Sequence, residues 1–171
     1  VVKQGRCELK RYWNWDPDSE PLSRLSLQEN AERFRDIFQR VVRDRLRTPK
    51  GYRPGAFLSG GLDSSSIVSL IASSPGFSPD RLPVFTILFP EVDPNYRIKH
   101  FDPLDETPYW TSVVEACHLE SHKIEISGWG PFENLAEHLW HEENPISYPT
   151  YAFNKQALNV ASSLGVRSLL R

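Results

Sequence analysis

Residues 56–66 of the chain read Ala56-Phe57-Leu58-Ser59-Gly60-Gly61-Leu62-Asp63-Ser64-Ser65-Ser66 and form its most informative pattern. The leading apolar residues are typical of the end of a buried strand. The glycines are typical of a sharp turn, and an amphipathic run begins after them. A strand that turns through glycines into a helix is an anion site, because the first backbone N–H groups are unpaired and the helix dipole favours negative charge. The serine hydroxyls add donors that suit phosphate oxygens.

The same residues exclude two common nucleotide loops. The loop G-x-x-x-x-G-K-[ST] needs a lysine for the β- and γ-phosphates, and this stretch has none. The dinucleotide fingerprint G-x-G-x-x-G is also absent. A carboxylate among phosphates requires a cation, so Asp63 is predicted to bind Mg²⁺ together with phosphate oxygens. The alternative is that Ser59 or Asp63 merely caps a helix and that the glycines merely turn the chain.

With its flanks, the S-G-G-L-D-S-S segment at 59–65 resembles the pyrophosphate-binding loop of the N-type ATP pyrophosphatases, and most of all that of asparagine synthetases. Two other segments are similar to asparagine synthetase patterns. One is R-Y-W-x-x-x-P at 11–17, and the other is Asp105-Glu106-Thr107-Pro108-Tyr109. Trp110 departs from the small residue usual in that family.

The resemblance implies a reaction. The family cleaves ATP to AMP and pyrophosphate, adenylating a carboxylate that ammonia then attacks. The expected function is adenylation of aspartate and formation of asparagine, with ammonia derived from glutamine by a glutaminase domain.

The resemblance also implies a set of ATP contacts. Leu58 and Ile87 would receive adenine, Ser59, Gly60, Gly61, Ser64 and Ser65 would bind pyrophosphate, and Asp63 would hold Mg²⁺. No side-chain nucleophile is expected, because catalysis would rest on positioning and electrostatics.

The resemblance also implies a domain organisation. Residues 1–25 are expected to be a linker from an N-terminal glutaminase domain, and residues 26–171 the N-terminal half of the synthetase domain. The family's next motif, [ST]-G-x-G-x-D-E, supplies a second acidic Mg²⁺ ligand and would begin at or just after Arg171. The chain is therefore expected to be an incomplete domain that is inactive alone.

Hydrophobic periodicity predicts strands that alternate with helices. Strands are expected to end near 58 and to span 83–89, 122–126 and 166–170. Helices are expected at 26–46, from 63 onward, and at 107–117, 131–143 and 153–164. This order predicts an α/β fold, a parallel sheet with helices on both faces, and the resemblance makes it adenine nucleotide alpha hydrolase-like. Ligands of such sheets bind beyond the carboxyl ends of the strands.

Several finer features are predicted along the helices. Ser26 and Glu29 form a capping box, and Thr107 caps the helix that Pro108 enters. Apolar residues of 26–46 are expected to fall on one helical face, and those of 131–143 are expected to face inward. Gly165 is expected at the C′ position of the last helix.

The composition limits which binding partners and which cellular compartment are expected for the protein. The chain has 20 Lys and Arg against 22 Asp and Glu, and no basic block indicates nucleic acid. No apolar run is long enough to span a membrane. The two cysteines, Cys7 and Cys117, cannot make a disulfide framework, which indicates a reducing cytoplasm. An oligomer is compatible with the sequence.

Three other functions are compatible with the S-G-G-L-D-S-S loop. The first is another amide-forming enzyme, such as a β-lactam synthetase or a lasso-peptide cyclase, which adenylates a different carboxylate. The second is a tRNA-modifying or nucleotide-synthesising relative, against which the balanced charge and the R-Y-W segment argue. The third is an ATP-binding module without catalysis.

Overall fold

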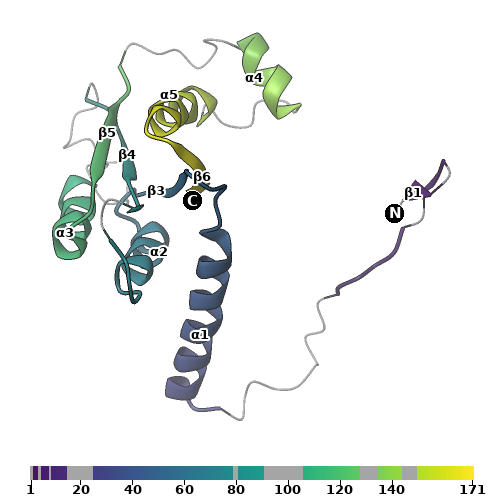
Figure 1. The fold of residues 1–171 in the computed structure, drawn as a ribbon, viewed down its shortest axis with the longest axis horizontal. Coiled ribbons are helices and arrows are strands. Elements are labelled where there is room, and N and C mark those ends of the chain that lie inside the picture. Colours follow the sequence, from purple (N-terminus) through teal and green to yellow (C-terminus); the bar gives the residue numbers. More distant parts are fainter. Residues whose placement is uncertain are drawn as a thin grey trace, which may run out of the picture. The chain divides into compact units, whose positions relative to one another are not determined.

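The computed structural model describes residues 2–3, 5–7, 9–14, 25–78, 81–90, 106–127, 135–143 and 150–171. Within them the chain divides into two units, Val1–Phe38 and Gln39–Arg171. The first unit contains an antiparallel pair of short strands, β1 (Val2–Lys3) and β2 (Arg6–Cys7). The second unit contains the sheet and its helices (Figure 1). None of the described helices is both long and apolar enough to cross a membrane.

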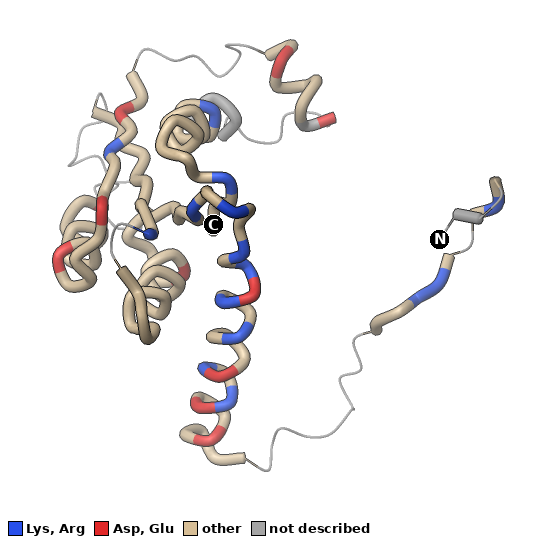
Figure 2. The backbone as a smooth tube through the Cα atoms, in the orientation of Figure 1, with Lys and Arg blue, Asp and Glu red and all other residues tan. Residues whose placement is uncertain are grey.

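Helix α1 (Leu27–Arg45) spans the boundary between the two units. Its start confirms the predicted capping box: the Ser26 backbone N–H donates to Glu29 Oε2 at 2.7 Å, and the Glu29 N–H donates to Ser26 Oγ at 3.2 Å. The Ser26 hydroxyl also donates to Glu29 Oε2 at 2.7 Å, and this bond, followed by that of the Ser26 N–H, holds the pKa of Glu29 below its usual value. Acidic and basic residues are interspersed along α1 (Figure 2), as on a solvated helix face.

The apolar residues predicted to share one face of 26–46 are mostly exposed in α1. Val42 is buried, whereas Phe34 and Val41 are exposed among the described residues. The inward face predicted for 131–143 is wrong in α4 (Leu135–Glu142), where Leu139 and Trp140 are exposed. The predicted residues 131–134 lie outside the described part of the chain. Periodicity identifies an apolar helix face, but it does not supply the element that covers that face.

The sheet has four parallel strands in the order β5-β4-β3-β6. They are β3 (Arg53–Phe57), β4 (Val84–Leu88), β5 (Ser121–Glu125) and β6 (Val166–Leu170). The chain moves outward from β3 through β4 to β5 and then returns to place β6 on the other side of β3. The strand order therefore reverses between β3 and β6.

Helices cover both faces of this sheet, which confirms the predicted fold class (Figure 1). Helices α2 (Leu62–Ala72) and α3 (Thr107–Cys117) lie on one face, and α5 (Thr150–Ser163) lies on the other. The main core cluster packs sheet residues against α5. Its buried members are Phe85, Ile124, Ile126, Ala157, Ala161 and Val166. Successive strand residues point to opposite faces, so Val84 and Thr86 face α2 and α3.

Two residues of β3 affect how this strand fits into the sheet: Gly55 through its packing and Pro54 through its pairing. A Cβ at Gly55 would lie 2.9 Å from Phe85 Cε2 and 3.1 Å from Val166 Cγ1, so only glycine leaves room for that ring. Pro54 has no N–H for the ladder, and the pairing of β3 with β6 shifts register between Arg53 and Pro54. Proline inside a sheet is tolerated at such irregularities.

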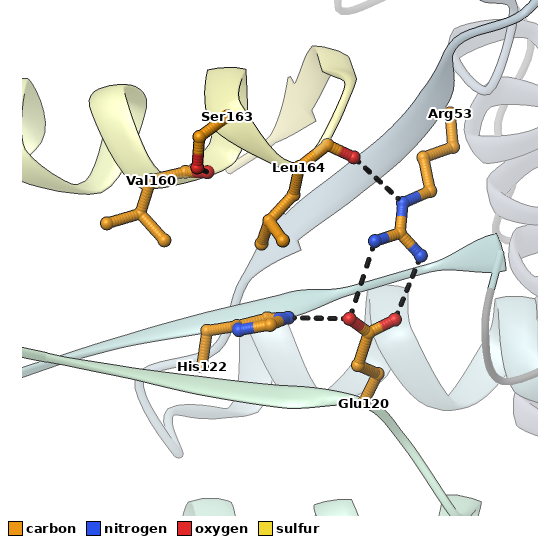
Figure 3. A network of polar contacts seen from close by, with 6 residues as sticks. All are labelled: Arg53, Glu120, His122, Val160, Ser163 and Leu164. Carbon is orange, nitrogen blue, oxygen red and sulfur yellow. Dashed lines mark hydrogen bonds and ion pairs between the residues drawn. The ribbon is translucent and has the colours of Figure 1, made fainter.

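A polar network joins the elements at the amino edge of the sheet, where strands begin (Figure 3). Arg53 donates through Nη1 to Glu120 Oε2 at 2.9 Å and through Nη2 to Oε1 at 3.4 Å. Its Nε also donates to the Leu164 carbonyl at 3.3 Å, and His122 Nε2 lies 2.9 Å from Glu120 Oε1. Partial burial raises the pKa of Glu120, but the hydrogen bonds from Arg53 and His122 outweigh it and lower that pKa below its usual value.

Candidate functional site

A cavity of about 540 Å³ lies at the opposite, carboxyl edge of the sheet. Its walls come from the ends of β3, β4 and β6 and from the beginnings of α2, α3 and α5. This position includes the reversal of strand order between β3 and β6. Ligands of open parallel sheets bind in the crevice at such a reversal. The cavity is therefore where the fold itself predicts a ligand.

The turn between β3 and α2 depends on Gly60. Its φ is +87°, a left-handed conformation that side chains disfavour. A Cβ there would also lie 3.0 Å from Tyr109 Cβ, 3.1 Å from the Glu106 carbonyl and 3.1 Å from the Trp110 nitrogen. Gly60 thus lets the loop pack directly on the first turn of α3.

Helix α2 begins without a side-chain cap. Gly61 is the N-cap residue and has no side chain to cap the helix, so neither Ser59 nor Asp63 occupies the N-cap position. The first N–H that bonds back along the helix is that of Ser65, which donates to the Gly61 carbonyl at 3.1 Å. The preceding turn therefore presents its N–H groups, and the positive end of the helix dipole, at the cavity.

The serine hydroxyls of the loop bond to one another and to the loop backbone. Ser59 Oγ and Ser64 Oγ are 3.2 Å apart, and the Ser59 N–H donates to Ser64 Oγ at 3.3 Å. The Gly61 N–H donates to Ser59 Oγ at 3.3 Å, while Ser64 Oγ donates to the Gly61 carbonyl at 3.2 Å. These contacts hold the loop in an ordered turn, and an incoming anion could replace several of them.

The end of β3 is anchored just before the loop. Buried Thr86 donates through Oγ1 to the Leu58 carbonyl at 2.8 Å, and the Leu58 N–H donates to the Phe85 carbonyl at 2.9 Å. These bonds continue the pairing of β3 and β4 past the last strand residue. The loop therefore starts from a rigid point of the sheet.

Two carboxylates line the cavity. Asp63 is exposed on the first turn of α2, and Glu106 is the N-cap residue of α3. Thr107 was predicted to be that cap, and the helix in fact starts one residue earlier. Partial burial raises the pKa of Glu106. The ligand atoms that these two side chains offer are carboxylate oxygens, which suit Mg²⁺ rather than a softer metal.

A complete metal cage is not formed by the described residues, where no group of three or more His, Cys, Asp or Glu could hold an ion. Mg²⁺ is commonly bound by one or two carboxylates together with phosphates. Asp63 therefore fits an ion that is shared with a phosphate ligand.

The structure brings most of the predicted site residues together. The predicted residues that line the cavity are Leu58, Ser59, Gly61, Asp63, Ser64 and Ile87. Leu58 is 0% exposed, so it forms the packed layer behind the wall. Gly60 lies against α3 instead, and Ser65 Oγ is buried without a hydrogen-bond partner among the described residues.

The sequence did not identify several residues of the cavity wall. They are Phe57, Phe85, Phe89, Glu106, Asn154 and Arg171. Glu106 belongs to a segment that resembles the family, and Arg171 follows a predicted strand. Both positions therefore gave a weak indication that the residue could lie at the site. Asn154 had none, because a polar residue near the start of a helix is usually solvated.

Comparisons with known proteins identify the family of the chain. The family model for asparagine synthase matches residues 33–165. A putative glutamine-hydrolysing asparagine synthetase 2 of Methanocaldococcus jannaschii is 28% identical over 92% of the chain and 28% of that protein. The glutamine-hydrolysing asparagine synthetase 3 of Bacillus subtilis is 30% identical over 75% of the chain and 20% of that protein. The chain thus spans less than a third of either relative.

A solved structure is also similar. It is the NH3-dependent NAD synthetase of Campylobacter jejuni, with 14% identity and a TM-score of 0.45 over 83% of this chain and 55% of that one.

Proposed function

This chain belongs to the asparagine synthase family, and from that premise we propose that it provides the ATP-binding part of a ligase that adenylates aspartate. The observation that carries the proposal is the uncapped start of α2, which opens into the cavity at the carboxyl edge of the sheet. Such a helix start binds phosphate through backbone N–H groups. The products of the adenylation step would be an acyl adenylate and pyrophosphate.

The loop would bind the β- and γ-phosphates that leave as pyrophosphate. Ser59 and Ser64 would give up their mutual hydrogen bond and bind phosphate oxygens instead. The backbone N–H groups after Gly61 would also donate to phosphate oxygens. Gly60 and Ser65 support this arrangement from behind, at the contact with α3 and inside α2. Preorganised donors of this kind stabilise charge that develops on the leaving group.

Asp63 would hold Mg²⁺ at the phosphate end of the cavity. When bound, Mg²⁺ would neutralise negative charge as a substrate carboxylate attacks the α-phosphorus. The chain itself would then orient the triphosphate, because Asp63 and Ser64 are adjacent residues in the first turn of α2 and both line the cavity. Rate enhancement would come from positioning rather than from a side-chain nucleophile.

The apolar part of the cavity would receive adenine. Ile87 is partly buried at the end of β4 and lines the cavity, and Leu58 supports the wall from behind. The phosphate loop follows β3 and Ile87 lies near the end of the neighbouring strand β4, so one nucleotide could reach both.

We extend the proposal to the second half of the reaction by analogy with the relatives, whose names describe glutamine hydrolysis. Ammonia released from glutamine would attack the acyl adenylate, giving asparagine and AMP. The second acidic Mg²⁺ ligand and the glutaminase would come from parts of the protein beyond this chain. The free state of Cys7 and Cys117 is compatible with the proposed cytoplasmic location.

ATP–pyrophosphate exchange by the full-length protein tests the proposal, with Mg²⁺ and a panel of carboxylic acids that includes aspartate. Exchange stimulated by aspartate alone is the expected result. Exchange with another acid would keep adenylation and replace the substrate, as in a β-lactam synthetase or a lasso-peptide cyclase. ATP binding without exchange for any acid would contradict the proposed ligase and favour a non-catalytic module. The 1–171 segment, assayed alongside, is expected to be inactive.

A further inference from the structure

Asn154 lies on the first turns of α5 and belongs to the helix face that packs on the sheet. It precedes Ala157 by three residues and Ala161 by seven, and those alanines are 0% and 2% exposed in the core cluster. Residues with this spacing share one face of a helix. Asn154, however, is only half-buried and lines the cavity.

The direction of α5 explains this position. The C-terminal end of α5 lies at the amino edge of the sheet, because the Arg53 N–H donates to the Gly165 carbonyl at 3.2 Å and Arg53 Nε donates to the Leu164 carbonyl. Gly165 has a φ of +75°, as predicted for its C′ position. The beginning of α5 therefore lies over the carboxyl edge, where Ile87 lies near the end of β4 and Phe89 follows the strand.

Asn154 is the only carboxamide among the described residues that line the cavity, and it shares the cavity wall with flat and aliphatic side chains. A carboxamide offers N–H donors and a carbonyl acceptor side by side. This pair complements the N7 acceptor and the N6 amino donor of adenine, whereas guanine presents two acceptors at the same edge. The lining carboxylates, Asp63 and Glu106, can only accept when ionised, and the Arg171 guanidinium can only donate.

We propose that Asn154 reads the N6/N7 edge of the adenine base and so makes the site specific for ATP over GTP. This inference rests on the proposed function, since it requires a purine nucleotide in the cavity. It adds a specificity-determining residue from α5 to a site otherwise built by β3, β4 and α2. The predicted effect falls on nucleotide choice rather than on the choice of acid.

The test measures binding of ATP, GTP and 7-deaza-ATP to the full-length protein by calorimetry, and pyrophosphate exchange in parallel. The compound 7-deaza-ATP lacks the N7 acceptor but keeps the N6 amine. Wild-type protein is expected to bind it about tenfold more weakly than ATP, the size of effect of one lost side-chain pairing. Asn154→Ala should bind both about equally and should lose preference over GTP. Asn159→Ala is the matched control, an exposed asparagine on the same helix, and should keep the wild-type ratios.

The outcomes separate this inference from the proposed function. Equal affinity of wild-type protein for ATP and 7-deaza-ATP overturns the role of Asn154, whether or not exchange occurs, and this comparison needs no variant to fold. Wild-type ratios in Asn154→Ala overturn it too, as does a variant that changes only the acid preference. Selective ATP binding that depends on Asn154, without exchange for any acid, would support the inference and contradict the ligase.

Discussion

Two glutamates at opposite edges of one sheet have pKa values that shift in opposite directions. Partial burial raises the pKa of Glu106, beside the cavity at the carboxyl edge. Glu120 at the amino edge is also partly buried, yet the hydrogen bonds from Arg53 and His122 lower its pKa (Figure 3). At the amino edge polar groups satisfy one another, and at the carboxyl edge they face a cavity.

The two edges therefore serve different purposes. The amino edge ties β3 and β5 to the end of α5 and contributes stability. The carboxyl edge keeps an uncapped helix, a left-handed glycine and a destabilised carboxylate, none of which helps folding. Local features that oppose stability are expected at functional sites, where a ligand compensates for them.

The largest effect on activity is expected for an alanine at Gly60 of the carboxyl edge, with an alanine at Gly51 of the amino edge as the comparison. Gly60 and Gly51 have nearly the same φ, +87° and +88°, but only Gly60 has neighbours where a Cβ would lie. Gly60→Ala should lower pyrophosphate exchange by about a hundredfold or more, because the loop must move away from α3. Gly51→Ala carries the same backbone strain and should keep its activity. Equal exchange rates in the two variants would contradict the positional role of Gly60.

A smaller loss is expected when the carboxylate of the cavity is neutralised. Asp63→Asn should reduce exchange by at least about tenfold and raise the Mg²⁺ concentration needed for half-maximal rate, because the amide is a weaker ligand. The control is Asp44→Asn, which removes only an exposed ion pair with Arg47 at 3.5 Å. Near wild-type turnover of Asp63→Asn across a Mg²⁺ titration would remove Asp63 from the mechanism.

At the amino edge the expected effect is on stability instead of activity. Glu120→Gln should lower the free energy of unfolding by about 1 kcal/mol at neutral pH, a modest value because the Glu120 side chain is 35% exposed. The folded-state pKa of Glu120 lies below the ordinary value of a glutamate, so its contribution is fully present above that ordinary value and is lost as pH falls through the lowered pKa. Urea unfolding of wild type and variant should therefore converge in acid. A constant difference at all pH values would argue against the ion pair.

The smallest effect is expected for a substitution of Glu106. It should raise the stability of the fold, whereas the substitution of Glu120 should lower it. The raised pKa of Glu106 means that its charged form costs stability above that pKa, and the cost disappears as pH falls through it. Glu106→Gln should raise the melting temperature by about 1–2 °C at neutral pH and leave it unchanged in acid. No capping bond is lost, since the Glu106 side chain does not cap α3. A lower melting temperature at neutral pH would show that the carboxylate is stabilising.

The sequence predicted the elements of the fold because their signals are local. Short apolar runs and one alternating segment predicted the strands, and the S-G-G-L-D-S-S segment predicted an anion site at the turn that the structure places between β3 and α2. Local reasoning failed where a partner was needed, as for Phe34 and Trp140, which are apolar but exposed. It was also imprecise at helix ends, as for Thr107, because neighbouring residues compete for the cap.

Residues close in sequence specified the loop, its uncapped helix and the parallel α/β class, since turn chemistry and periodicity act over a few positions. Contacts between distant segments required the folded chain. Arg53 and Glu120 are 67 positions apart, and Gly60 lies against the start of α3, which follows β4 in the chain. The strand order, the burial of Glu106 and the place of Asn154 over the carboxyl edge likewise arise from packing. No local pattern encodes them, because each depends on which surfaces meet when the sheet assembles.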